Sequence, residues 1–153
     1  MFCKAALTNI ISMVCKPMGY YSDNACNQLL GIAAQESTCG KNLKQIGGGP
    51  ARGIWGIELI TENDTWENYL IFRPFLISFL MTYTGVKGPS ENDLMYNHLY
   101  GAALARIILL RKPGEIPGDL LGQSQYWKAH WNTKGGKGTV GRYIENWNLY
   151  MVT

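Results

Sequence analysis

Helical spacing of apolar residues is the dominant pattern in this 153-residue chain. Apolar side chains recur at intervals of three and four, the spacing of one face of an α-helix, and strong strand-like alternation is absent. Prolines, glycines and capping residues divide the pattern into segments. The predicted helices span residues 3–16, 23–37, 61–72, 75–83, 91–111, 120–132 and 140–150. We therefore expect a mainly α fold, with a small hairpin or loop region near residues 40–58.

Length and composition favour one globular domain over residues 1–153. The hydrophobic content of 46% is sufficient for a core, and the net charge of +3 is too small to indicate a nucleic-acid partner. No apolar run is long enough to span a membrane. The N-terminal stretch lacks a signal-peptide cleavage pattern, so we expect it to form a first helix that ends at Pro17 and Gly19.

The cysteines and histidines do not predict a metal site. Cys3, Cys15, Cys26 and Cys39 form no CxxC pair, and neither histidine lies at ligand spacing from them. We expect no metal and no organic cofactor. Four cysteines could form two disulfides in a secreted chain, but without a signal peptide buried free thiols are the better expectation.

Glu36 occupies a position where the helical pattern calls for an apolar residue. Cys26, Leu29, Leu30 and Ala33 follow one another at intervals of three and four, and the next steps fall on Glu36 and Ser37. Burial of a carboxyl group raises its pKa, and a glutamate protonated near neutral pH can act as a general acid. The alternative is an exposed glutamate at a frayed helix end. Periodicity favours neither.

A glycine-rich loop follows Glu36 and leads into the segment Gly53, Ile54, Trp55 and Gly56. The run at residues 47–49 matches neither a P-loop nor a dinucleotide fingerprint, and an ordinary loop is the better interpretation. An aromatic residue beside a close backbone can hold a sugar ring. Taken by itself, however, Trp55 between two glycines is better explained as a core tryptophan.

The predicted helix 91–111 has a long apolar stripe and several small residues, which is typical of a central buried helix. Asn97 and Tyr100 are expected to face a cleft from this helix. His98 is expected at the surface.

Four short motifs, taken together and in this order, resemble a known family. They are Glu36-Ser37, then residues 51–56 closed by Thr61, then Asn97 with residues 101–103, and finally Trp131-Asn132. The chain resembles the lysozyme-like superfamily, specifically lytic transglycosylase domains and related bacteriophage proteins. The similarity in order and approximate spacing extends over residues 29–140.

This resemblance implies a catalytic role for Glu36 as sole acid/base. It would protonate the bond between N-acetylmuramic acid and N-acetylglucosamine in bacterial peptidoglycan, then take a proton from the muramyl C6 hydroxyl to leave a 1,6-anhydro product. A hydrolytic lysozyme would need a second carboxylate, for which Glu58 and Asp64 are the nearby candidates. The residues expected to line the substrate groove are Ser37, Trp55, Glu58, Tyr100, Trp131 and Asn132.

The chain departs from the family pattern at several positions. The family glutamine is replaced by Gly56, the proline before the threonine by Leu59, and the motif tyrosine by Trp131, with His130 and Thr133 in place of alanines. Because the missing glutamine supports the catalytic glutamate in the family, a polar partner for Glu36 is expected from Gln45 or Arg52.

Two principal functional hypotheses follow. The first is a peptidoglycan-cleaving phage enzyme, carried in the virion or held in the host cytoplasm before it is released to the cell wall. The second is a catalytically degenerate module of a phage tail or virion that binds the wall or neighbouring proteins through an exposed aromatic surface within residues 127–147. A weaker third hypothesis is a helical module that binds a host protein.

Overall fold

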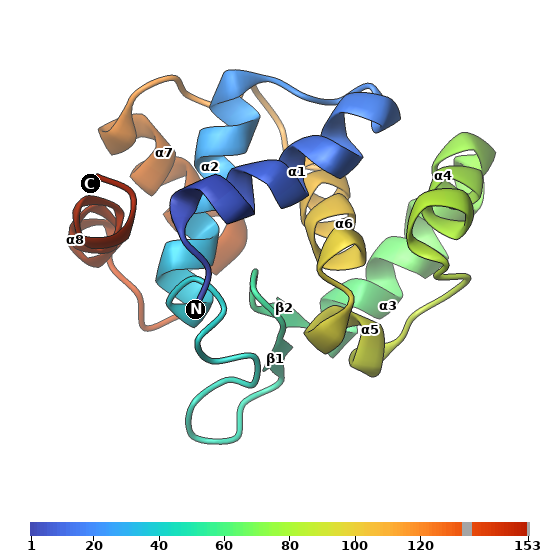
Figure 1. Cartoon of the computed structure of the whole chain (residues 1–153), viewed down its shortest axis with the longest axis horizontal. Helices are drawn as coiled ribbons and strands as arrows, with labels where there is room; N and C mark the ends of the chain where they lie inside the picture. Colours follow the sequence, from blue (N-terminus) through green and yellow to red (C-terminus); the bar gives the residue numbers. More distant parts are fainter. Residues whose placement is uncertain (133–135, 153) are drawn as a thin grey trace.

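The computed structural model describes residues 1–132 and 136–152. Residues 133–135, which include the motif position Thr133, therefore lie outside the described residues. The elements are α1 (Lys4–Met18), α2 (Asp23–Ser37), β1 (Ala51–Arg52), β2 (Ile57–Glu58), α3 (Leu59–Asn68), η1 (Leu70–Phe72), α4 (Pro74–Thr84), α5 (Glu91–Tyr96), α6 (His98–Leu110), α7 (Leu120–Trp127), η2 (Lys128–Asn132) and α8 (Val140–Tyr150). The expected mainly α fold is confirmed (Figure 1).

Helix α2 occupies the middle of the molecule. It packs against α7 and α8 on one side and against α1 and α6 on the other (Figure 1). Ser22 caps its N-terminus by accepting a hydrogen bond from the Ala25 amide. Gly31 lets α8 approach closely, since a Cβ atom at this position would overlap the Tyr143 hydroxyl. The residue after α2, Thr38, has a left-handed backbone with a φ of 53°, which ends the helix.

The predicted helix 91–111 is two helices, which corrects the sequence prediction. Asn97 lies between α5 and α6, with φ of −96° and ψ of 88°, outside the helical region. Its side chain caps α6 by accepting a hydrogen bond from the Tyr100 amide, and its amide group donates to the Thr84 carbonyl. An asparagine that bonds to the backbone in this way competes with helix continuation. Helix α6 itself is buried, as expected.

Other boundaries differ by a few residues. Pro17 does not end α1 but lies in its last turn, and Gly19 ends the helix with a φ of 86°. Helix α3 begins at Leu59, two residues before the predicted start at Thr61. The predicted helix 120–132 is α7 followed by the π-helical turn η2, and it begins after Asp119, whose side chain caps it. Boundary differences of this size are common where several capping residues compete.

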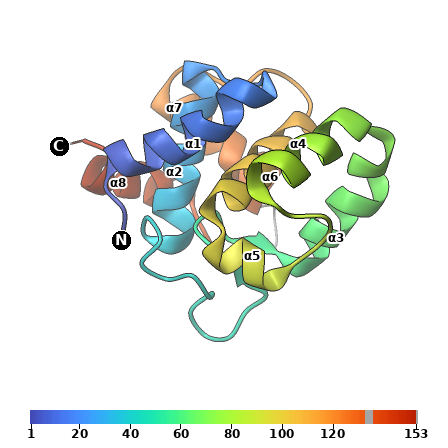
Figure 2. The same cartoon turned by 45° about the vertical axis from the view of Figure 1, so that its right-hand side comes forward.

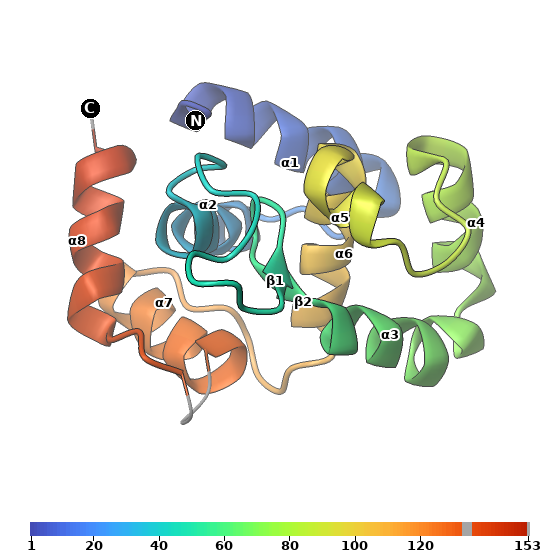
Figure 3. The same cartoon turned by 90° about the horizontal axis from the view of Figure 1, so that it is seen from below.

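Residues 38–58 form a long loop that ends in a two-stranded antiparallel ribbon, β1 and β2. Ala51 pairs with Glu58 and Arg52 with Ile57, so the expected short hairpin is present. Figure 2 shows this loop below α2, and Figure 3, seen from below, shows it between α8 on one side and α3 and α5 on the other.

Several surface predictions are corrected. His98 is half-buried and packs edge-on against Phe2, with ring centroids 5.1 Å apart, rather than lying free at the surface. Cys15, Cys26 and Cys39 are buried thiols as expected, whereas Cys3 is exposed.

Among the described residues, no helix has both the length and the apolar character needed to cross a membrane.

Candidate active site

A cleft of about 790 Å³ opens between the C-terminal end of α2, the ribbon, and η2 with the residues that follow it. Figure 3 shows these parts from below, with the ribbon between the α7–η2 segment and α3. Four of the predicted site residues line the cleft: Glu36, Glu58, Trp131 and Asn132. Three others, Ser37, Trp55 and Tyr100, do not.

Glu36 lies in the last turn of α2, where the helix end brings its side chain to the cleft. Burial raises the pKa of the Glu36 carboxyl to about 7, and the negative charge of Glu58 acts in the same direction. A hydrogen bond from Trp127 lowers the pKa and partly offsets both effects. Near neutral pH this carboxyl group is therefore divided between its protonated and ionised forms, the condition in which a group can both give and take a proton.

Trp127 is the polar partner of Glu36. Its indole Nε1–H donates a hydrogen bond to Glu36 Oε1 at 2.8 Å, and its ring is fully buried. The expectation that Gln45 or Arg52 would fill this role is wrong. Gln45 accepts a hydrogen bond from the Ala51 amide, and Arg52 pairs with Glu91, so both side chains are held within or beside the loop.

Gly56 brings backbone directly against the Glu36 side chain. Its φ is +59°, and a Cβ atom there would lie 2.9 Å from Glu36 Cβ. A side chain of any size at position 56 would therefore displace Glu36. The departure from the family glutamine is thus accompanied by a different arrangement, in which glycine provides close packing and Trp127 provides the hydrogen bond.

Ser37 is a structural residue, contrary to the prediction that it lines the groove. Its buried hydroxyl donates to the Ile54 carbonyl at 2.6 Å and accepts a hydrogen bond from the Gly40 amide at 2.7 Å. These bonds fix the end of α2 to the turn at residues 53–56. Ser37 therefore acts on the site through its neighbours, by positioning the helix end that carries Glu36.

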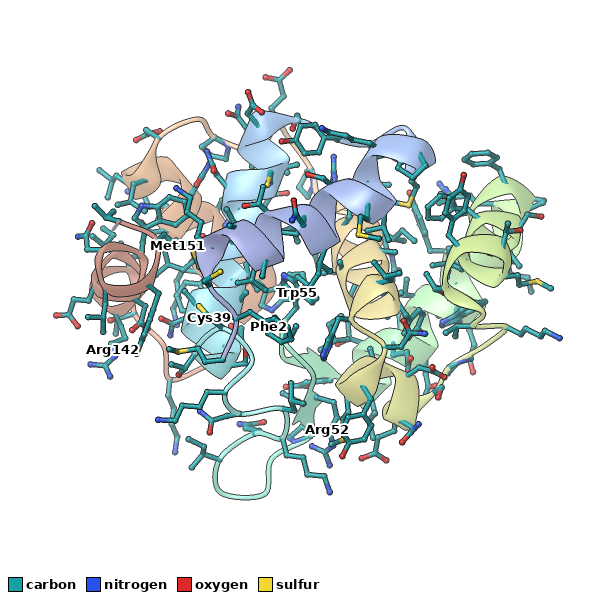
Figure 4. The ribbon with its side chains drawn as sticks, in the orientation of Figure 1. Phe2, Cys39, Arg52, Trp55, Arg142 and Met151 are labelled. Carbon is teal, nitrogen blue, oxygen red and sulfur yellow. The ribbon has the colours of Figure 1, made fainter. Side chains whose placement is uncertain are left out.

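Trp55 lies in the core, so its predicted contact with substrate is also corrected. The side chain is 1% exposed, and its indole nitrogen donates to the Leu29 carbonyl at 3.1 Å. Figure 4 shows Trp55 in the interior between α2 and α6. The core interpretation, which the sequence alone already favoured, is the correct one.

Tyr100 is likewise buried, and it contacts a carboxylate that the sequence analysis missed. Its hydroxyl donates to Glu62 Oε2 at 2.5 Å and accepts a hydrogen bond from Trp66 Nε1 at 2.9 Å. Burial raises the pKa of Glu62, while the bonds from Tyr100 and the Ser90 amide lower it. Because Glu62 is 2% exposed and does not line the cleft, this group joins α3, α5 and α6 as part of the structure. Neither Tyr100 nor Asn97 faces the cleft.

Lys128 stabilises the wall of the cleft that η2 and the residues after it form. Its ammonium group donates to Asn132 Oδ1 at 2.6 Å and to the carbonyl groups of Gly136 and Gly138 at 3.0 and 2.7 Å. Asn132 is thereby oriented at the edge of the cleft beside Trp131, which is half-buried. Glu58 faces them from the end of β2 and is exposed.

Comparison with protein-family models, with curated proteins and with solved structures found no match to this chain. Within residues 1–132 and 136–152, no three histidine, cysteine or acidic side chains gather in a group that could hold a metal ion.

Proposed function

We propose that this protein cleaves the glycosidic bond between N-acetylmuramic acid and N-acetylglucosamine in peptidoglycan, with Glu36 as the single catalytic acid/base. The observation that carries the proposal is the position of Glu36 in the wall of a large cleft, with its pKa raised to about 7. A protonated carboxyl group beside a sugar polymer can protonate a leaving oxygen at neutral pH.

In the proposed reaction the Glu36 proton passes to the glycosidic oxygen as the bond from that oxygen to muramyl C1 breaks. The C6 hydroxyl of the same muramyl residue then forms a bond to C1. The Glu36 carboxylate accepts the proton of that hydroxyl and returns to its starting form. No water is consumed, so the product carries a 1,6-anhydro ring. Trp127 assists by holding the carboxylate in place and stabilising its ionised form.

The lining of the cleft suits such a substrate. Trp131 offers an apolar ring face for a sugar, and Asn132 offers amide groups for hydrogen bonds to hydroxyl or acetamido groups. Lys44, Lys112 and Lys137 also line the cleft, and their charges favour a polymer whose stem peptides carry carboxylates.

A variant pair tests the catalytic assignment. Glu36→Gln keeps the shape of the side chain but cannot transfer a proton, so release of soluble fragments from purified peptidoglycan should fall about 10²- to 10⁴-fold. Glu145→Gln makes the same change on α8, away from the residues that line the cleft, and should keep full activity. Equal activity of the wild type and Glu36→Gln would refute the assignment.

From the resemblance to bacteriophage proteins we also propose where the enzyme acts. The enzyme would act from the phage virion, or would accumulate in the host cytoplasm before it reaches the wall. Peptidoglycan would be its substrate, and other virion or tail proteins would be its assembly partners.

A second candidate function is a virion module that binds a neighbouring subunit and has no catalytic activity. A specific surface favours it: Ile71, Phe72 and Phe75 are 60%, 74% and 64% exposed around the junction of η1 and α4. The aromatic surface expected within residues 127–147 is not exposed in this way, since Trp127 is buried and Trp131 and Trp147 are half-buried. Sedimentation analysis of the wild type and of a Phe72→Ser, Phe75→Ser variant tests this candidate. The non-catalytic function would be favoured if the wild type self-associates, the variant does not, and the wild type cleaves no peptidoglycan.

A further inference from the structure

A second pocket, of about 350 Å³, lies beside the start of α2 and the C-terminal half of α6. The segment that connects α6 to α7 forms its other wall, held to α2 by a hydrogen bond from the Asn24 amide group to the Ile116 carbonyl at 3.3 Å. Figure 1 shows this segment passing from α6 to α7 behind the upper end of α2. Of the residues that the structure describes, Lys112 alone lines both this pocket and the Glu36 cleft.

Arg106 brings a positive charge to this pocket without an acidic partner. Its Nε–H donates to the Tyr20 carbonyl at 2.8 Å, and its guanidinium forms no ion pair with any described residue. Burial lowers the pKa of Arg106, and the titratable groups that act on it are Cys15, Tyr126, Tyr20 and Tyr69. A partly buried guanidinium with unused donors and no countercharge is suited to hold an anion.

Tyr126 lines the same pocket and carries a buried, unused donor. Its side chain is 7% exposed, and within the described part of the chain its hydroxyl has no hydrogen-bond partner. A buried hydroxyl without a partner costs free energy that a bound acceptor would recover. The charge of Arg106 lowers the pKa of Tyr126 against the effect of burial, which places the two groups within electrostatic reach of each other.

We propose that this pocket binds a small oxyanion, carboxylate or phosphate, through the Arg106 guanidinium and the Tyr126 hydroxyl, with Lys112 at its rim. A planar guanidinium can donate two parallel hydrogen bonds to such a group, and the hydroxyl can donate a third. Exposed Glu115 also borders the pocket and opposes the binding of anions by repulsion. The site does not depend on the role proposed for Glu36, because Arg106 and Tyr126, which would hold the anion, do not line the Glu36 cleft.

Titrations followed by nuclear magnetic resonance test this proposal. The full chain is titrated with inorganic phosphate and, separately, with N-acetyl-alanine, which presents a peptide carboxylate. We expect saturable shifts at Asn24, Arg106 and Gly114 with at least one probe. A stronger response to N-acetyl-alanine would show that the pocket prefers a carboxylate. A stronger response to phosphate would show that it prefers the phosphate group of a phosphorylated compound.

Three variants complete the test. Tyr126→Phe removes only a hydroxyl that has no partner, so the fold should survive while affinity falls about tenfold or more. Glu115→Gln should raise the affinity. Arg142→Gln removes a positive charge from the exposed surface of α8 and should leave the affinity unchanged. The absence of saturable shifts with both probes would overturn the proposal, as would an affinity that Tyr126→Phe does not change.

Discussion

The indole nitrogen of Trp127 donates a hydrogen bond to Oε1 of Glu36 at 2.8 Å, although the two residues are 91 positions apart in the chain. This contact joins α7 to the end of α2 at the cleft. It favours the ionised carboxylate, whereas burial favours the protonated form. The balance between the two effects sets the pKa of Glu36 near neutrality.

Replacement of Trp127 by phenylalanine should raise the pKa of Glu36 further. A hydrogen bond to a charged group contributes about 1.5 to 3 kcal/mol, which corresponds to a rise of about one to two pH units. Since a general acid must be protonated, the loss of activity at high pH should move upward by a similar amount. Carboxyl resonances recorded during a pH titration measure the same shift without relying on activity.

Trp66→Phe is the matched control for that variant. Trp66 is also a buried tryptophan, and its indole nitrogen donates to Tyr100 rather than to Glu36. It should lose stability without moving the pKa of Glu36. Equal titration of Glu36 in the wild type and in Trp127→Phe would contradict the role given to Trp127.

Gly56→Ala should both destabilise the fold and displace Glu36. Alanine at a positive φ costs about 1 to 2 kcal/mol, and the added Cβ would press on Glu36 Cβ. Gly85→Ala is the control, because Gly85 has a φ of +75° with nothing within 4 Å of an added Cβ. Both variants should show lowered free energies of unfolding in urea, but only Gly56→Ala should lose wall cleavage. Full cleavage by a folded Gly56→Ala variant would contradict the importance of this contact.

Glu36→Gln should stabilise the protein above neutral pH. The pKa of Glu36 is 4.5 when unperturbed and about 7 in the fold. Between these values the unfolded chain releases its proton while the folded chain keeps it, so the stability of the wild type falls as pH rises. The glutamine variant lacks this loss and should be more stable by about 1 to 3 kcal/mol above pH 7, a range reduced for the partial exposure of the site. Below pH 4 the difference in stability between the two proteins should vanish. Urea unfolding below pH 4 and above pH 7 measures it, and an equal difference at both pH values would contradict the raised pKa of Glu36.

Tyr100→Phe should weaken the fold and leave the cleft unchanged. Without the hydroxyl, the buried Glu62 carboxylate keeps only the Ser90 amide, its pKa rises further, and the cost is about 1 to 3 kcal/mol. Tyr21→Phe removes a hydroxyl whose hydrogen bond to Asp23 is exposed to solvent and should cost much less. Thermal unfolding and wall-cleavage assays measure the two effects separately. A large loss of wall cleavage in a stably folded Tyr100→Phe variant would contradict the structural role and indicate that Tyr100 acts in the site.

The helices could be predicted because their signals are local. Ser22 marks the start of α2, and Pro74 the start of α4, through bonds and backbone constraints within one turn. The break at Asn97 was missed because the apolar stripe continues across it, and the Thr84 carbonyl that accepts the competing hydrogen bond lies at the end of another helix, α4.

The site could be predicted only in part. Periodicity left a buried and an exposed Glu36 equally open, and it is the packing around the end of α2 that buries the carboxyl group. The role of Trp127 had no local signal, because a tryptophan needs an acceptor for its N–H but the sequence does not say which one. Trp55 and Tyr100 were assigned to the cleft from residue type and place in the chain, whereas their burial depends on how α2, α3 and α6 pack.

The most direct test of the central claim is the mass of the products released from purified peptidoglycan. Wild type, Glu36→Gln and Glu58→Gln are compared, since Glu58 is the second carboxylate at the cleft. We predict products lighter by one water than hydrolytic fragments from the wild type and from Glu58→Gln, and none from Glu36→Gln. Hydrated products that require both glutamates would contradict the single-glutamate mechanism, and no products from the folded wild type would contradict the enzymatic function itself.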